Sequence, residues 1–462
     1  MGHRHPDQSN AVPALQIATI NPLKMSAPTL ETLLTPKNAE AAWDRVRRNH
    51  GCPGVDGVSI EELEPHFDQQ WLQTSRAMIS GDYRPQPLLR VRIPKPTGGE
   101  RLLGIPSVLD RVVQQATTQV LSPCWEPRFS PRSFAYRPGR GTRDALAAVE
   151  RGLAHGAPWV LHLDIESFFD SVPHSVALSA IHGELSDPRF ARLIEGTLKC
   201  GVYENGLVRP TTVGLAQGSP LSPLLANVVL HRLDSSLTAR RWEFARYADD
   251  CVILLPSEAE ARAAQSAACE TLAALDLRIN QRKTRLTHYA DARFLGFAFK
   301  STNGSPPLRT VSPESLAEIE GAITRILQTS GAEPQSIAKE SAALLRSWLA
   351  YFYTPHDEAR LRELAERIAE QWRTRFPGFS LPTDLTWDSI RANVSSADHV
   401  DYSGHLHDDS LFGDGIDWLE SLKCLLTRAA RARWWHIEYD LDRGGHPAVR
   451  LCIGRHRINL RF

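Results

Sequence analysis

The segment ARYADDCVILL, residues 245–255, places two adjacent carboxylates between two runs of apolar and aromatic residues. We expect a β-hairpin with Asp249 and Asp250 at its tip, because both flanks are apolar and the centre is short and acidic. A third carboxylate, Asp164, directly follows an apolar run at residues 159–163 that we also expect to be a strand. An isolated Asp–Asp pair is more often a solvated turn, so this segment alone does not decide the chemistry.

The three aspartates nevertheless indicate a cation, because carboxylates that end apolar strands are costly to bury unless a cation neutralises them. Their oxygen atoms are hard ligands, and no cluster of His and Cys accompanies them, which favours Mg²⁺ over zinc. Two Mg²⁺ ions about 3.5–4 Å apart are the usual arrangement for activating a 3′-hydroxyl and stabilising a leaving pyrophosphate.

The composition is typical of a globular enzyme, with 462 residues of which 42% are hydrophobic and 23% are charged. No apolar run approaches the roughly 20 residues that a membrane span needs, and the polar, His-rich start predicts no secretory signal. The seven cysteines include no Cys-x-x-Cys pair, so we expect free thiols in a reducing cytoplasm, and neither a disulfide scaffold nor a zinc module. The net charge of zero permits a nucleic-acid partner without requiring one.

Further segments surround the hairpin in a definite order. Along the chain they are AWDRVRRNHGCPGVDGVS (42–59), YRPQPLLRVRIPKPTGGERLLGIPSVLDRVVQQA (83–116), FSPRSFAYRPGRGTRDAL (129–146), LDIESFFDSVPH (163–174), GLAQGSPLSPLLANVVLHRLD (214–234), LRINQRKTRL (277–286) and RFLGFAF (293–299). This series resembles the reverse transcriptases of the group II intron lineage over about residues 33–300. A chance match in this order is very improbable.

The resemblance implies an α+β fold, the right-hand polymerase, with fingers, a palm built on an antiparallel sheet, and a helical thumb. We expect thumb helices over residues 313–328, 334–352 and 357–375. The expected divisions are a mobile leader (1–27), an N-terminal extension (28–82), fingers (83–155), a palm (156–310), a maturase-like thumb (311–376), an acidic linker (377–417) and a basic C-terminal module (418–462). We identify no family resemblance in that last module, and its alternating residues 446–462 predict strands.

The implied reaction is RNA-directed DNA synthesis with two Mg²⁺ ions, using dNTPs and an RNA template paired with a DNA or RNA primer. Asp164, Asp249 and Asp250 match the catalytic, metal-binding carboxylates of the family. Ile165 follows Asp164 at the position where the family's backbone lies beside the metal and the incoming nucleotide.

Several residues match nucleotide-contacting positions. Phe168, four residues after Asp164, matches the aromatic residue that lies under the sugar and excludes a 2′-hydroxyl, whereas we expect Phe169 to pack in the core. Core packing is the alternative for Phe168, and a solvated surface is the alternative for each basic residue. The full nucleotide-binding set is Lys95 and Arg101 for the triphosphate, Ile165, Phe168, Gln217 and Gly218 at the sugar and base, and Lys283 near the leaving pyrophosphate.

For four arginines and one asparagine, the sequence does not decide between a functional and a structural role. The basic, turn-rich run of Arg132, Arg137, Arg140 and Arg143 resembles a track for the template backbone, but a solvated basic loop is equally expected. Asn227, on the helix expected after Gln217, is as well explained by structure as by catalysis.

The biological role also has alternatives. The segment SWLAYFY (347–353) resembles a maturase thumb motif, which favours an intron-encoded reverse transcriptase with a cognate structured RNA as partner, although such aromatic residues are more often core. The neutral charge and the absence of an HNH endonuclease pattern favour a host-adopted relative in antiviral or CRISPR-associated defence. A splicing cofactor that only binds RNA is disfavoured by the intact carboxylates and by Lys95 and Arg101.

Overall fold

The computed structural model describes residues 28–94, 100–301, 304–329, 333–389 and 391, and the strand backbones of residues 435–441, 447–453 and 456–460. Its centre is a four-stranded antiparallel sheet in the order β6-β7-β3-β8. The strands are β3 (Trp159–Leu163), β6 (Glu243–Tyr247), β7 (Asp250–Leu255) and β8 (Arg285–His288). The apolar run 159–163 and the hairpin at 245–255 therefore lie in one sheet, as the sequence predicts.

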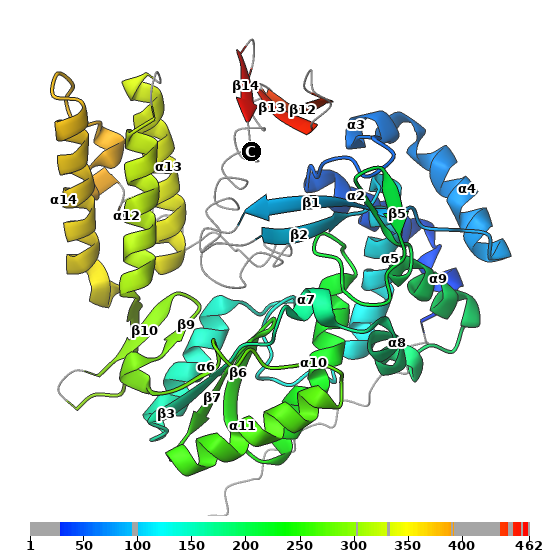
Figure 1. Ribbon diagram of the computed structural model, residues 1–462, viewed down its shortest axis with the longest axis horizontal. Helices are drawn as coiled ribbons and strands as arrows, with labels where there is room; N and C mark the ends of the chain where they lie inside the picture. The colour runs from blue at the N-terminus through cyan, green and yellow to red at the C-terminus, as the bar shows by residue number, and fades with distance from the viewer. Residues whose placement is uncertain are drawn as a thin grey trace, which may run out of the picture.

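The two faces of this sheet belong to two different cores, because successive side chains of a strand point to opposite faces. Leu161 and Ile253 pack in one core with the helices that follow β5 and β7, and Val160 and Val252 pack in the other core. The covering helices are α10 (Ser222–Ala239) and α11 (Glu258–Ala273) on the first face and α6 (Thr142–Ala154) on the second. This layered arrangement fixes the ends of β3 and β7, where the expected carboxylates lie (Figure 1).

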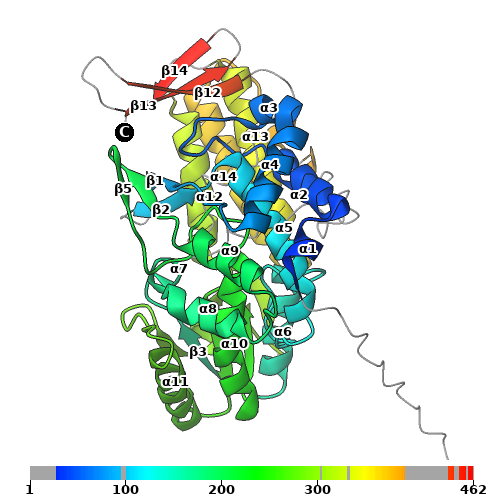
Figure 2. The ribbon, with the colours of Figure 1, turned by 90° about the vertical axis from the view of Figure 1, so that its right-hand side faces the viewer.

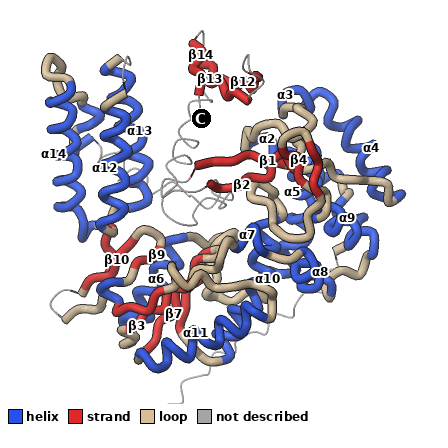
Figure 3. The backbone as a smooth tube through the Cα atoms, in the orientation of Figure 1, coloured by secondary structure: helices blue, strands red, loops and turns tan. Residues whose placement is uncertain are grey.

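A second sheet, in the order β2-β1-β4-β5, combines two distant parts of the chain. Its strands are β1 (Leu88–Pro94), β2 (Glu100–Ile105), β4 (Val202–Glu204) and β5 (Leu207–Arg209). β1 pairs antiparallel with β2, and it pairs parallel with β4 through Leu88 beside Val202. The expected fingers segment, residues 83–155, therefore shares its sheet with strands from the segment expected to be palm, as Figure 3 shows by placing these strands together and apart from the central sheet.

Helices from the N-terminal part cover this side of the molecule. Figure 2 shows α2, α3 and α4 above α7 and α8. Their bounds are α1 (Leu30–Leu33), α2 (Pro36–Arg48), α3 (Ile60–Leu63), α4 (Phe67–Ser80), α5 (Val108–Trp125), α7 (Phe168–Ser171), α8 (His174–His182) and α9 (Pro188–Leu198). The short helix α1 is tied to α9 because the backbone N–H of Leu30 donates to Asp187 Oδ2 at 3.0 Å.

The three expected thumb helices form as predicted to within one residue at each end. They are α12 (Pro313–Leu327), α13 (Pro334–Phe352) and α14 (Glu358–Arg375), and they stand at the left of Figure 1. They follow a small sheet of β9 (Arg293–Phe294), β10 (Phe297–Lys300) and β11 (Leu308–Val311). Their buried residues join the core on the second face of the central sheet.

The aromatic segment SWLAYFY lies at the C-terminal end of α13. Trp348 and Phe352 are buried with their rings stacked 4.5 Å apart, and the Tyr351 hydroxyl donates to the carbonyl of Leu295 at 3.1 Å. These three side chains therefore pack between α13 and the β9–β10 connection. This packing agrees with the expectation that the aromatic residues of SWLAYFY are core residues.

The C-terminal part forms a three-stranded antiparallel sheet in the order β12-β13-β14. The strands are β12 (Trp435–Leu441), β13 (Pro447–Ile453) and β14 (His456–Leu460). The strands predicted within residues 446–462 are confirmed. Of the other divisions, the leader 1–27 and most of the acidic linker lie outside the described residues. Among the helices that the structure describes, none combines the length and apolar character needed to cross a membrane.

Candidate active site

Asp164 is held at the end of β3 by its own backbone. Its carbonyl accepts a hydrogen bond from the backbone N–H of Asn280 at 2.7 Å, and its N–H donates to Thr284 Oγ1 at 3.2 Å. The segment NQRKT is thereby fixed beside this carboxylate. The Lys283 ammonium lies 3.7 Å from Asp164 Oδ1, so the sequence segments that carry these two residues meet at one place.

Asp249 lies in the two-residue turn between β6 and β7. The register pairs Tyr247 with Asp250, which leaves Ala248 and Asp249 as the turn residues. Ala248 adopts a φ of +56°, in the left-handed region that non-glycine residues rarely occupy. The turn is therefore specified by its surroundings rather than by the intrinsic preference of alanine.

Asp250 differs from the expectation, because it is the first residue of β7 and not part of the tip. Its carboxylate is close to the His162 side chain, with Oδ1 and Nε2 2.5 Å apart. It is also absent from the residues that line the cleft described next. The structure thus brings Asp164 and Asp249 together on one cleft, whereas Asp250 contacts His162.

A cleft that is open to solvent lies over these carboxylates. It brings together the hairpin and five of the surrounding segments that carry the family resemblance. The lining residues are Arg101, Tyr136, Asp164, Ile165, Ser167, Phe168, Phe169, Asp170, Ala216, Gln217, Gly218, Ser219, Ser222, Pro223, Asp249, Asn280 and Lys283. Six of the seven expected nucleotide-binding residues are in this set, and the seventh, Lys95, lies outside the described residues.

The loop with Gln217 and Gly218 is hydrogen-bonded to β2 on one side and to α7 on the other. The carbonyl of Gln217 accepts the N–H of Gly104 in β2 at 2.9 Å. Gly218 has a φ of +115°, and a Cβ there would lie 3.1 Å from the Gly104 carbonyl oxygen, so glycine is required for this close approach. On the other side, the Leu215 N–H donates to the carbonyl of Phe169 at 2.6 Å.

The two phenylalanines are buried in the reverse of the expected order. Both residues line the cleft, but Phe168 is 1% exposed within the apolar core, whereas Phe169 is half-buried. A ring without exposed surface cannot contact a sugar without displacing its neighbours. The structure therefore favours Phe169 over Phe168 as the aromatic wall of the nucleotide pocket.

The four arginines of the expected template track have separate environments, and none of them lines the cleft. Arg137 is 2% exposed, forms an ion pair with Glu126 at 2.7 Å, and donates to the carbonyls of Ser130 and Ser133 at 2.6 Å. This burial corrects the expectation for Arg137, because its guanidinium is already used in folding the loop. Arg132 pairs with Glu243, Arg140 donates to the Pro131 carbonyl at 2.8 Å, and Arg143 is exposed on α6.

The cleft residues that sequence reasoning did not name as site residues include Tyr136, Ser167 and Asn280. Tyr136 has a φ of +60°, which is exceptional for a bulky residue and is a known mark of functional sites. Each of the three lies within a segment that carries the resemblance. Their position within those segments was therefore the only sequence feature that pointed to the cleft. Their residue types alone did not distinguish these three residues from residues that pack in the core.

The donor set of the cleft fits a hard divalent cation. Within the described residues, no group of three or more His, Cys, Asp or Glu side chains forms a complete metal site. Mg²⁺ is commonly bound by one or two protein carboxylates, with water and substrate phosphates completing the shell. Asp164 and Asp249 on one wall supply such a partial site, and the Lys283 ammonium shows that Asp164 attracts a cation.

Comparison with known proteins identifies the family. Residues 93–299 match the family described as reverse transcriptase (RNA-dependent DNA polymerase). Protein YkfC of Escherichia coli (strain K12) is 32% identical over 286 residues, which cover 54% of this chain and 74% of that protein. Group II intron-encoded protein LtrA of Lactococcus lactis subsp. cremoris is 32% identical over 215 residues, covering 46% of this chain and 36% of that protein.

A chain of the solved partial Cas6-RT-Cas1–Cas2 complex matches with a TM-score of 0.34 and 26% identity, covering 53% of this chain and 41% of that chain. This chain thus spans about a third of LtrA but three quarters of YkfC. The matched range includes Asp164, Asp249 and every residue of the Gln217 loop. The chain belongs to the reverse transcriptases, the family of RNA-directed DNA polymerases, and within it to the group II intron-like members.

Proposed function

We propose that the cleft catalyses RNA-templated DNA synthesis on a DNA or RNA primer, with two Mg²⁺ ions held at Asp164 and Asp249. The strongest support is that one cleft is lined by these two carboxylates, by the basic side chains of Arg101 and Lys283, and by the Gln217–Gly218 loop. The bound ions would supply charge neutralisation at the primer hydroxyl and at the pyrophosphate that leaves. Reverse transcriptases as a family use divalent ions, and the oxygen donor set favours Mg²⁺ among them.

The residues around the carboxylates have chemically distinct tasks in this proposal. Arg101 on β2 and Lys283 beside Asp164 supply positive charge for the triphosphate, together with Lys95. Gln217 and Gly218 bring a polar backbone close to the nucleotide, with the backbone of Ile165 alongside. Phe169 lies where a sugar with a 2′-hydroxyl would be excluded. Asp250 would support the site indirectly, through its contact with His162 on β3.

The wider partners are also part of the proposal. We propose the divisions into N-terminal extension, fingers, palm, thumb and C-terminal module as given above, with β4 and β5 assigned to the fingers sheet. Arg132, Arg140 and Arg143 remain candidates for contact with a template backbone. A maturase-like role with a cognate structured RNA is favoured by the likeness to an intron-encoded protein. The five described cysteines are all free thiols, which suits a reducing cytoplasm.

Primer extension on an RNA template with Mg²⁺ tests the central claim. Asp249→Asn should reduce extension to background, because the substitution removes a charged oxygen ligand from the cleft. Asp250→Asn should retain more activity than Asp249→Asn, because Asp250 does not line the cleft. Asp68→Asn, at an exposed position on α4, is the matched control for loss of one surface charge. Undiminished extension by a well-folded Asp249→Asn protein would refute the assignment.

A further inference from the structure

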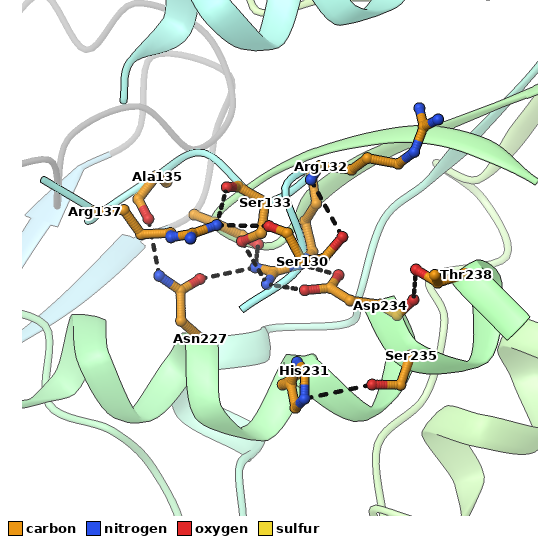
Figure 4. Close-up of polar contacts among 12 residues, drawn as sticks. Ser130, Arg132, Ser133, Ala135, Arg137, Asn227, His231, Asp234, Ser235 and Thr238 are labelled. Carbon is orange, nitrogen blue, oxygen red and sulfur yellow. Dashed lines mark hydrogen bonds and ion pairs between the residues drawn. The ribbon is translucent and has the colours of Figure 1, made fainter. Parts of the chain in front are cut away.

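One buried arginine beside the cleft has every hydrogen-bond donor occupied. Arg246 on β6 is fully buried, and its Nε and Nη2 bond both carboxylate oxygens of Asp234, at 2.7 and 2.6 Å. Its Nη1 donates to Asn227 Oδ1 at 2.9 Å and to the Ala248 carbonyl at 2.8 Å, and its Nη2 donates to Ser133 Oγ at 2.8 Å. Figure 4 shows Asn227 and Asp234, both on α10, on one side of these contacts and Ser133 on the other.

Each neutral partner of Arg246 lies on a different segment that also supplies a residue to the cleft lining. Ala248 directly precedes Asp249 in the turn. Asn227 is on α10, whose first residues, Ser222 and Pro223, line the cleft. Ser133 belongs to the segment that leads to Tyr136, another lining residue. One guanidinium therefore sets the mutual position of three segments.

Backbone hydrogen bonds reinforce the same arrangement. The Phe134 N–H donates to the Arg246 carbonyl, and the Arg246 N–H donates to the Arg132 carbonyl, both at 2.9 Å. The Asn227 Nδ2 donates to the Ala135 carbonyl at 2.8 Å, so Asn227 bridges Arg246 and the residue before Tyr136. These hydrogen bonds give Asn227 a structural contact. The sequence had left open whether its role is structural or catalytic.

Stability alone does not account for such a centre. A buried ion pair is often no more stabilising than well-packed apolar residues of the same volume, because both charges must leave water. The Ala248 backbone, in contrast, has a φ of +56° that its own side chain disfavours, and the Arg246 guanidinium bonds the carbonyl of that residue. The pair is therefore placed to fix the turn that carries Asp249.

We propose that Arg246 is a positioning residue, which holds Asp249 and the adjoining cleft walls in the arrangement that binds a divalent cation. The inference rests on the proposed function and adds to it the group that determines the geometry of the cation site. Loss of groups that orient metal ligands typically weakens metal binding about 10–100-fold. We expect Arg246→Lys to have an effect of this size, because lysine keeps the charge but provides three donors in place of five.

The test measures Mn²⁺ binding to the full chain by electron paramagnetic resonance, without substrates, alongside thermal melting. Four proteins are compared: wild type, Arg246→Lys, Asp249→Asn and Asp187→Asn. Asp187 is a buried carboxylate paired with Arg189, far from the cleft at the start of α9, so its substitution should lower the melting temperature and leave Mn²⁺ affinity unchanged. Arg246→Lys should weaken Mn²⁺ binding about 10–100-fold and raise the Mg²⁺ concentration needed for half-maximal extension.

The outcomes separate the two claims. If Asp249→Asn binds Mn²⁺ as the wild type does, the proposed cation site itself is wrong. If Asp249→Asn loses binding but Arg246→Lys melts lower with wild-type affinity, Arg246 is only structural and the inference is overturned. Should Arg246→Lys fail to fold, Ser133→Ala removes a single bond to the guanidinium. That variant should weaken Mn²⁺ binding to a smaller degree, and wild-type affinity in it would refute the inference.

Discussion

Replacing Phe168 and Phe169 by alanine, one at a time, should separate folding from sugar selection. The rings are neighbours, with centroids 5.4 Å apart and planes at 77°, yet their surroundings differ. Phe168 is 1% exposed within the larger core, and Phe169 is half-buried at the cleft wall. The hydrogen bond from Leu215 to the Phe169 carbonyl involves only backbone, so it is available to alanine as well.

The expected magnitudes follow from this burial. Truncating a fully buried phenylalanine to alanine costs about 3–5 kcal/mol, because apolar contact is lost and a cavity remains. Removing the half-buried Phe169 ring should cost about 1–2 kcal/mol, in proportion to the smaller apolar area that it buries. The effect on sugar selection should be the reverse of the effect on stability. The preference for dNTP over NTP should fall in Phe169→Ala and not in Phe168→Ala. Loss of the Phe169 ring should reduce the preference for dNTP over NTP by about 10–200-fold.

The assay combines thermal or denaturant unfolding with single-nucleotide kinetics on one primer and RNA template. The kcat/KM ratio of a dNTP to the matching NTP should fall in Phe169→Ala and stay unchanged in Phe168→Ala. Phe169→Tyr is the matched control, since it keeps the ring and should retain the preference for dNTP. If Phe168→Ala, rather than Phe169→Ala, relaxes sugar selection, then the assignment of the cleft wall from burial is incorrect.

Two further predictions concern other parts of the chain. Burial lowers the pKa of His174, whose Nε2 lies 2.9 Å from the Gly214 carbonyl oxygen. The contribution of His174 to the free energy of unfolding should therefore be constant above the unfolded-state pKa of about 6.5. That contribution should be lost as the pH falls from there toward the lowered pKa of the folded state. The melting temperature of the wild type should therefore fall more steeply than that of His174→Gln between pH 7 and pH 5, and parallel curves would contradict this. Truncation after Ile416 should leave extension of a generic primer intact but weaken binding to co-purifying RNA, because the last 42 residues hold nine bases against three acids. Normal melting with unchanged RNA affinity in the truncated protein would exclude an RNA-docking role for this module.

The sequence predicted those features that depend on local pattern. Apolar runs bounded by turn residues predicted β3 and the β6–β7 hairpin, and helical periodicity predicted α12, α13 and α14 to within one residue. The family resemblance brought Asp164, Asp249 and Gln217 together, and the structure places all three on one cleft. Local pattern and segment order were sufficient for these features because neither depends on the direction of an individual side chain.

Features that depend on one residue's orientation could not be read from the sequence. Whether Asp250 belongs to the turn or to β7 changes which way its carboxylate points, and a short acidic tip fits both registers. The burial of Phe168 and Phe169 is the reverse of the expected order for the same reason, because adjacent residues of one type differ only in orientation. Arg137 and Arg246 are charged residues whose burial depends on partners at Glu126 and Asp234, and no periodicity marks such pairs.

The parallel pairing of β1 with β4 has a consequence for how the chain is made. Leu88 lies beside Val202, so more than 100 residues must be synthesised after β1 before its second neighbour exists. Pairings between such distant residues form late, because the intervening loop must close first. During translation β1 and β2 would remain an isolated hairpin, which is marginally stable in water at best. A ribosome stalled after residue 155 should therefore display a nascent chain whose β1–β2 segment is sensitive to protease, and protection should begin only when β4 and β5 have left the exit tunnel.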